Sequence, residues 1–122
     1  MNKSIIADKS FSFAKNIIML YKSLNDKNKE YIISKQVLRS GTSIGANVIE
    51  ALSGQSKKDF LAKMCISIKE ADETEYWLKL LLETGYIKKE LGRKLIEQCT
   101  ELSKILNAII KTTTKSVTND KC

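Results

Sequence analysis

The 122-residue sequence has no histidine and no proline, and only two of its 21 basic residues are arginine. Without histidine, the chain lacks the commonest general acid or base and the commonest nitrogen ligand for transition metals. Because proline interrupts helices, its absence favours long ones. Lysine is a hydrated point charge, whereas base reading and bidentate phosphate contacts rely on arginine. We therefore expect no metal, no cofactor and no enzymatic activity, and any binding of anions should be diffuse.

Cysteine and long apolar runs are also scarce. The three cysteines, Cys65, Cys99 and Cys122, form an odd set with no close pair, which favours a reducing compartment. Cys65 and Cys99 stand among apolar residues, and we interpret them as small hydrophobes. The richest apolar run, residues 77–82, is broken by Lys79, and the first residues lack a long apolar core. A soluble, cytoplasmic protein without a membrane span is expected.

The positive charge is unevenly distributed along the chain. The net charge is +7, and 43% of the residues are hydrophobic, which is typical of a single globular domain with its own core. Residues 1–29 and residues 87–122 each carry a net charge of +4, whereas the residues between them carry −1. Any surface that attracts an anionic partner should therefore be formed by the two ends of the chain.

Apolar residues recur at spacings of three and four along four segments, which is the pattern of amphipathic helices. Short polar turns separate the segments, and short connections make consecutive helices antiparallel neighbours. The sequence thus predicts an all-α fold of four helices, with antiparallel neighbours, that forms a single domain over residues 1–114. A flexible C-terminal tail is expected at residues 115–122. The predicted helices span residues 8–24, 29–52, 57–84 and 88–113. Ser56, followed three residues later by Asp59, indicates the start of the third helix, and Gly85 indicates its end.

The first two helices contain residues that indicate where a helix begins and which side packs against the core. In the first, Ser10 is a candidate N-terminal cap, with Ser4 and Asp8 as alternatives. In the second, Gly41 and Gly45 each cost about 1 kcal/mol of helix stability relative to alanine, so close packing must compensate. The apolar residues expected to face the core are Phe11, Ala14, Ile17, Ile18, Tyr21 and Leu24 in the first helix, and Val37, Ile44, Val48 and Leu52 in the second.

The third helix places carboxylates near its apolar side. Its expected apolar positions are in line with Glu75, and a polar strip of Ser67, Glu70 and Thr74 runs beside them. If the turn between the second and third helices is centred near residue 55, Arg39 faces Glu70. Paired carboxylates beside an arginine can shuttle protons, but a structural ion pair needs the same residues, and no histidine or nucleophile accompanies them. We interpret the set as structural. The apolar positions are Leu61, Met64, Ile68, Ala71, Leu78 and Leu82.

Three segments carry a resemblance to a known family: RSGTSIGANVIEA, KKDFLAKMCISIKEADETEYWLKLLLETGYI and ELSKILNAIIK. They resemble the four helix bundle protein family, which includes the proteins of intervening sequences in bacterial large-subunit ribosomal RNA genes and is also labelled S23 ribosomal protein. The chain is similar as well to the accessory variability determinants of diversity-generating retroelements. The resemblance implies an antiparallel up-down four-helix bundle, its assembly into a homopentameric ring, and no known reaction. The retroelement branch implies nucleic-acid binding in support of a reverse transcriptase.

The family motif marks residues on the second and third helices of this chain. Asp59 and Phe60 belong to it, and the remaining positions are taken here as one structural polar network. That network comprises Arg39, Ser43, Asn47, Glu50, Glu70 and Glu75.

Two classes of function remain open on these grounds. The first is a basic homo-oligomer that binds RNA or DNA through lysines of the first and fourth helices, and the alternative is a protein–protein interaction scaffold whose charge only confers solubility. Trp77 is either a stacking platform for bases or an anchor for a core or interface. The candidate nucleic-acid-binding residues are Lys9, Lys15, Lys22, Lys94, Lys104 and Lys111.

Overall fold

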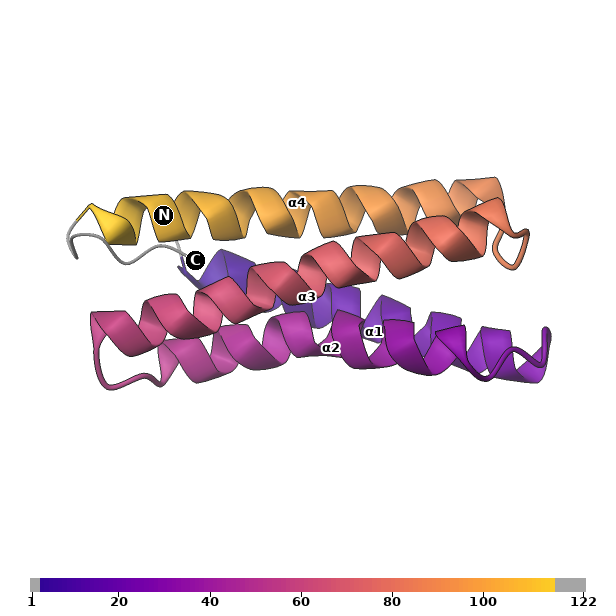
Figure 1. Cartoon of the computed structure of the whole chain (residues 1–122), viewed down its shortest axis with the longest axis horizontal. Coiled ribbons are helices and arrows are strands. Elements are labelled where there is room, and N and C mark those ends of the chain that lie inside the picture. The colour runs from indigo at the N-terminus through magenta and orange to yellow at the C-terminus, as the bar shows by residue number, and fades with distance from the viewer. Residues whose placement is uncertain (1–2, 116–122) are drawn as a thin grey trace.

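The computed structural model describes residues 3–115, and side chains from residue 5 onward. These residues form four helices, α1 (Lys3–Asp26), α2 (Ile33–Leu52), α3 (Lys57–Glu83) and α4 (Lys89–Thr114), and no strand. The predicted all-α fold with four helices is confirmed. The helices lie side by side along one long axis, and each begins at the end of the molecule where the previous one finishes (Figure 1). Apart from Lys115, the predicted C-terminal tail, including Cys122, lies outside the described residues.

The four helices do not contact one another equally. Helix α2 packs extensively against both α1 and α3, and α4 packs against α3. The contact between α1 and α4 is the least extensive of the four. The bundle is therefore closed tightly on three sides and loosely on the fourth.

The start of α2 lies four residues after its predicted position, because the backbone before it adopts a conformation that a helix does not allow. Lys29 has a φ of 56°, in the left-handed region. The carboxylate of Glu30 then accepts hydrogen bonds from three backbone N–H groups in the first turn, at 2.7 to 3.2 Å. These N–H groups would otherwise lack partners, so Glu30 fixes where the helix begins. The three residues that donate are Ile32, Ile33 and Ser34.

Helix α1 is longer than predicted, and the stripe that it buries shares only Ile17 and Leu24 with the predicted one. Ser10 is not its cap, because the helix begins at Lys3 and the buried hydroxyl of Ser10 donates to the carbonyl of Ala7 at 3.2 Å. Phe11, predicted to be in the core, is 66% exposed. Both stripes repeat every three to four residues, and the buried one is the stripe that faces the other helices. The buried residues are Ile6, Ser10, Phe13, Ile17, Leu20 and Leu24.

The ends of α3 follow the predicted signals. The side chain of Ser56 accepts a hydrogen bond from the N–H of Asp59 at 3.1 Å, and Gly85, with a φ of 82°, follows the last turn. The predicted polar strip, in contrast, belongs partly to the core, because Ser67 and Thr74 are fully buried.

Buried hydroxyl groups join α2 to α3. Thr74 donates to Ser40 at 2.8 Å, and Ser67 donates to the backbone carbonyl of Ile44 at 2.8 Å. Because a buried polar group without a partner is costly, these bonds favour one alignment of the two helices over others.

The apolar core surrounds these groups and includes Cys99, whose thiol donates to the carbonyl of Ala71 at 3.2 Å. Burial, followed by the charges of Glu75 and Asp72, raises the pKa of Cys99 to about 12. The Cys99 thiol is therefore an inert part of the core, as predicted. Cys65 packs partly buried against the same core.

Helices long and apolar enough to cross a lipid bilayer are absent from residues 3–115.

Candidate functional site

Arg39 lies at the centre of a polar cluster that links α2 to α3. Its guanidinium contacts Glu70 at 3.2 Å and also pairs with Glu73, and the indole N–H of Trp77 donates to Glu73 at 2.9 Å. The predicted contact with Glu70 is therefore present, whereas Glu73 was not predicted. Trp77 also packs edge-on against Tyr76, with ring centroids 5.1 Å apart. Because its N–H is already bonded and its ring is half-buried, Trp77 anchors the margin of the α2–α3 contact.

The Arg39 side chain is 48% exposed, so the ion pairs are not in the core. The residual exposure of Glu70 is 20% and that of Glu73 is 35%. Water therefore screens these charges, and the large energetic cost of an orphaned buried carboxylate does not apply to this cluster.

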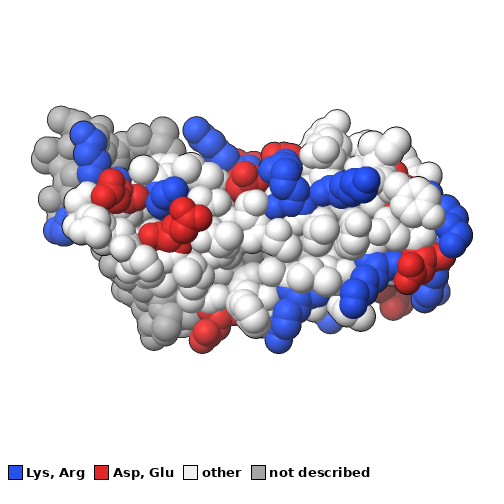
Figure 2. Space-filling view, turned by 90° about the horizontal axis from the view of Figure 1, so that it is seen from below, with Lys and Arg blue, Asp and Glu red and all other residues white. Residues whose placement is uncertain are grey.

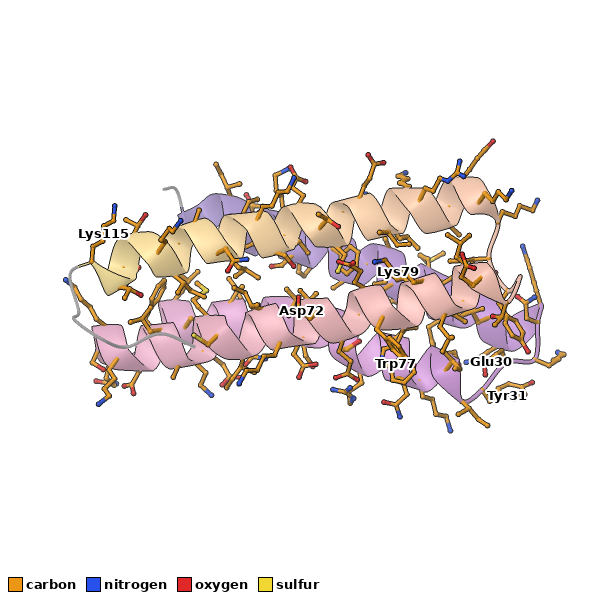
Figure 3. The ribbon with its side chains drawn as sticks, turned by 45° about the horizontal axis from the view of Figure 1, so that its top comes forward. Glu30, Tyr31, Asp72, Trp77, Lys79 and Lys115 are labelled. Atoms are coloured by element: carbon orange, nitrogen blue, oxygen red, sulfur yellow. The ribbon has the colours of Figure 1, made fainter. Side chains whose placement is uncertain are left out.

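Glu75 belongs to a separate pair, which corrects its predicted place beside Arg39. The ammonium of Lys79 on the same helix donates to the Glu75 carboxylate at 2.7 Å, and this hydrogen bond, followed by the charge of Glu75, raises the pKa of Lys79. Figure 3 shows Lys79 and Trp77 on opposite sides of α3. The phase of the helix explains the error, because Glu73 follows Glu70 by three residues and shares its face, whereas Glu75 does not.

The remaining members of the predicted network do not join the Arg39 side chain either. Ser43 donates to the backbone carbonyl of Arg39 at 2.6 Å, and Asn47 donates to that of Ser43 at 2.8 Å. Glu50 pairs with Lys63 on α3 at 2.9 Å. The six residues thus form several local interactions along α2 and α3 instead of one network.

These groups form ion pairs within and between helices. Glu70 and Glu73 share the guanidinium of Arg39, and Glu75 pairs with Lys79. Residues 3–115 contain no group of three potential metal ligands. Of the other motif positions, Phe60 is buried in the core and Asp59 lies in the first turn of α3.

The six predicted nucleic-acid-binding lysines are divided between different faces. Lys94 and Lys104 line a shallow hollow of about 630 Å³ on α4, and Lys111 follows Lys104 by two turns on the same helix face. Lys9 lies across the α1–α4 groove and pairs with Glu101 at 3.2 Å. Lys9 and Lys94 border the looser side of the bundle, whereas Lys104 and Lys111 are exposed on the outer face of α4.

Lys15 and Lys22 lie on the other flank of α1. The ammonium of Lys15 is 5.5 Å from the ring centroid of Phe11, and Phe11 lines the groove between α1 and α2. Lys22 follows Lys15 by two turns and therefore shares its face. The six lysines therefore lie on more than one face of the bundle, because those of α1 point to both of its neighbours.

Sequence reasoning also missed an apolar groove between α1 and α2, with a volume of about 340 Å³. Figure 2 shows this face of the molecule, on which an uncharged band runs between margins that carry basic side chains. The apolar residues of α1 that line it had been assigned to the core, so their exposure was not foreseen. The lining residues are Ala7, Asp8, Ser10, Phe11, Ala14, Thr42, Gly45, Ala46 and Ile49.

Comparison with known proteins identifies the family. The family model for the 23S rRNA-intervening sequence protein matches residues 2–108. A crystal structure of a protein of unknown function from the S23 ribosomal protein family of Bacteroides thetaiotaomicron is similar to this chain, with 50% identity and a TM-score of 0.89. The match covers 91% of this chain and 99% of that one. No curated protein matches. The chain therefore belongs to the 23S rRNA-intervening sequence protein family.

Proposed function

We propose that this protein is a homo-oligomeric, non-enzymatic module that binds RNA or DNA through Lys9 and the exposed lysines of α4. The observation that carries this proposal is the exposure of Lys94, Lys104 and Lys111 along the outer side of α4, with Lys94 beside the loosest contact of the bundle. A net charge of +7 adds long-range attraction for a polyanion.

The proposed contact is electrostatic and independent of base sequence. Lysines neutralise phosphates as point charges, and Glu97 and Glu101 beside the same hollow reduce the local positive potential. One subunit should therefore bind weakly. A homopentameric ring, which the family resemblance implies, would present the surface five times and raise the overall affinity by multivalency.

The test is a titration of labelled RNA and DNA into the assembled protein. If six or more phosphates are neutralised, affinity should fall by about 10³ between 50 and 200 mM salt, because bound counterions are released. Replacing Lys94→Glu together with Lys104→Glu should weaken binding strongly. Lys27→Glu with Lys69→Glu makes the same change in charge on other surfaces and should weaken binding much less. Absence of binding at the lowest salt by a folded, assembled sample would contradict the proposal.

A protein–protein interaction scaffold is the second candidate, and the apolar groove between α1 and α2 favours it. The resemblance to the retroelement proteins adds to the first proposal a role as accessory to a reverse transcriptase. In that role the reverse transcriptase is the protein partner. Co-purification of this protein with a reverse transcriptase encoded beside its gene, in the presence and absence of nuclease, distinguishes a direct contact from one through nucleic acid. Co-purification that survives nuclease, together with a negative titration, would favour the scaffold.

A further inference from the structure

All four tyrosines and the single tryptophan of the chain lie near one end of the bundle. At this end α1 connects to α2, and α3 connects to α4 (Figure 1). Tyr31 and Tyr86 lie in the two connections, and the other three residues lie within about two helical turns of the helix ends there. We refer to this end, with residues 27–32 and 84–88, as the tyrosine end.

Backbone hydrogen bonds hold Tyr86 in a fixed position. Gly85 follows α3 with a φ of 82°, and its N–H donates to the carbonyl of Leu82 at 3.2 Å. The N–H of Tyr86 donates to the carbonyl of Leu81 at 3.0 Å. These two bonds form the Schellman motif that ends many helices. Ile87 is buried directly after them, so Tyr86 is anchored on both sides although it is 41% exposed.

The connection that contains Tyr31 is also held in place. The N–H of Glu30 donates to the carbonyl of Leu24 at 3.0 Å, and the Glu30 carboxylate accepts from the first turn of α2. The hydroxyl of Ser34 donates to Asn25 at 3.0 Å, which joins the start of α2 to the end of α1. Tyr31 is 50% exposed at this end of the molecule (Figure 3). Two exposed rings on fixed backbone are preorganised for a ligand, because little conformational freedom is lost on binding.

The positive charge of the tyrosine end lies on its α4 side. Residues 83–94 include four basic and two acidic side chains, and all six are exposed. Residues 26–30 are neutral overall, with two lysines and two acidic residues. Within the described chain, none of the four basic groups takes part in an ion pair. The basic residues are Lys88, Lys89, Arg93 and Lys94, and the acidic ones are Glu83 and Glu90.

Exposed aromatic rings beside exposed cations match the chemistry of a single-stranded nucleic acid. Unpaired bases stack on aromatic side chains, and lysine or arginine neutralises the phosphates between them. Bases inside a duplex cannot reach such a ring unless they leave the stack. A lipid surface would need more aliphatic area, because Ile32 is the one exposed large aliphatic residue in residues 27–32 and 84–88.

We propose that the tyrosine end binds single-stranded RNA or DNA, whose bases stack on Tyr31 and Tyr86. The phosphates of the same strand follow the start of α4 from Lys88 to Lys94. This inference rests on the proposed nucleic-acid binding and specifies the form of the nucleic acid. The lysines of α4 still attract a duplex, so the new expectation is a preference for single strands.

Tyr31→Leu and Tyr86→Leu test the stacking, because leucine keeps apolar volume but has no ring. Each should lower the affinity for labelled oligo(dT) and oligo(U) about tenfold, which is within the range for one stacked base. Affinity for a duplex of oligo(dA) and oligo(dT) depends on charge alone and should change by less than about twofold. Tyr86→Phe keeps the ring and should bind single strands as the wild type does.

Phe11→Leu is the matched control. It removes a ring that is 66% exposed on α1, about 22 Å from the tyrosine end, and should leave the affinity for single strands unchanged. Circular dichroism should show the helicity of the wild type for all four variants.

The outcomes separate this inference from the proposed function. Equal affinity of the wild type for single strands and duplexes, or leucine variants that bind single strands normally, would overturn the inference and leave the proposed function intact. Failure to bind either form would overturn both. Sedimentation with phosphatidylserine vesicles tests a membrane surface. Leucine variants that lose vesicle binding but keep their affinity for single strands would assign the tyrosine end to lipid and overturn the inference.

Discussion

The contacts that α2 makes with its neighbours differ in kind from the contact between α1 and α4. On either side of α2, buried hydroxyls bond across to α3 and glycines bring α1 close. Across the α1–α4 contact, the polar links are at the surface, from Lys9 to Glu101 and from Asn16 to Gln98 at 3.1 Å, with hollows beside them. The first arrangement fixes the fold, and the second leaves side chains available to a ligand.

The largest loss of stability should come from adding side-chain volume at the α1–α2 contact. Gly41→Val places new atoms where an added Cβ already lies 2.9 Å from Ile17, so we expect the free energy of unfolding to fall by about 2 to 3 kcal/mol. Chemical denaturation measures it. Gln36→Val, at an exposed position of the same helix, carries the cost of β-branching without the clash and serves as the control. Equal midpoints for both variants would show that α1 can move away at no cost.

A gain in stability is expected where a buried hydroxyl lacks a partner. Among the described residues, the hydroxyl of Ser103 on α4 is the buried side-chain group without a hydrogen bond, in contrast to Ser40 and Ser67 at the α2–α3 contact. Ser103→Ala should raise the free energy of unfolding by about 1 kcal/mol. Thermal unfolding followed by circular dichroism tests this, and a lower melting temperature would mean that the hydroxyl is satisfied in solution.

Arg39→Ala should have a smaller effect than a buried ion pair would predict. The pairs with Glu70 and Glu73 are partly exposed, so we expect a loss of at most about 1 kcal/mol. The same denaturation measurement at low and high salt applies, and the loss should shrink as salt increases. A loss near 3 kcal/mol that salt does not alter would instead indicate a desolvated pair.

The smallest effect is expected at the α1–α4 contact. A double-mutant cycle of Lys9→Ala and Glu101→Ala should give a coupling of about 0.5 kcal/mol or less, because both side chains are about half exposed. The cycle is evaluated from denaturation midpoints. A coupling above about 1 kcal/mol, the upper end for exposed pairs, would show that the α1–α4 contact is not weaker than the contacts of α2.

The spacing of apolar residues in the sequence was sufficient to locate the four helices but not to place every helix boundary. Periodic apolar residues located the four elements, and Ser56 and Gly85 marked the ends of α3. The start of α2 was misplaced because nothing in the sequence distinguishes a left-handed Lys29 from a helical one. Only the folded chain reveals that Glu30 caps the helix.

The candidate sites needed the relative rotation of the helices, which the sequence does not specify. Phe11 and Phe13 both belong to apolar stripes of α1, and which stripe is covered depends on where α2 and α4 lie. Glu73 was missed and Glu75 was misassigned for the same reason, since a shift of two residues turns a side chain by more than half a helical turn. The apolar groove became visible once the covered stripe was known.

The order of the helices also has a consequence for folding kinetics. Three of the four contacts join helices that are consecutive in the chain, and the α1–α4 contact alone brings distant segments together. Chains dominated by such local contacts fold quickly, and their weakest long-range closure is the place where native-state opening starts. A ligand bound to both α1 and α4 would stabilise the closed state against that opening. Hydrogen exchange along both helices would then slow as more of the protein binds ligand.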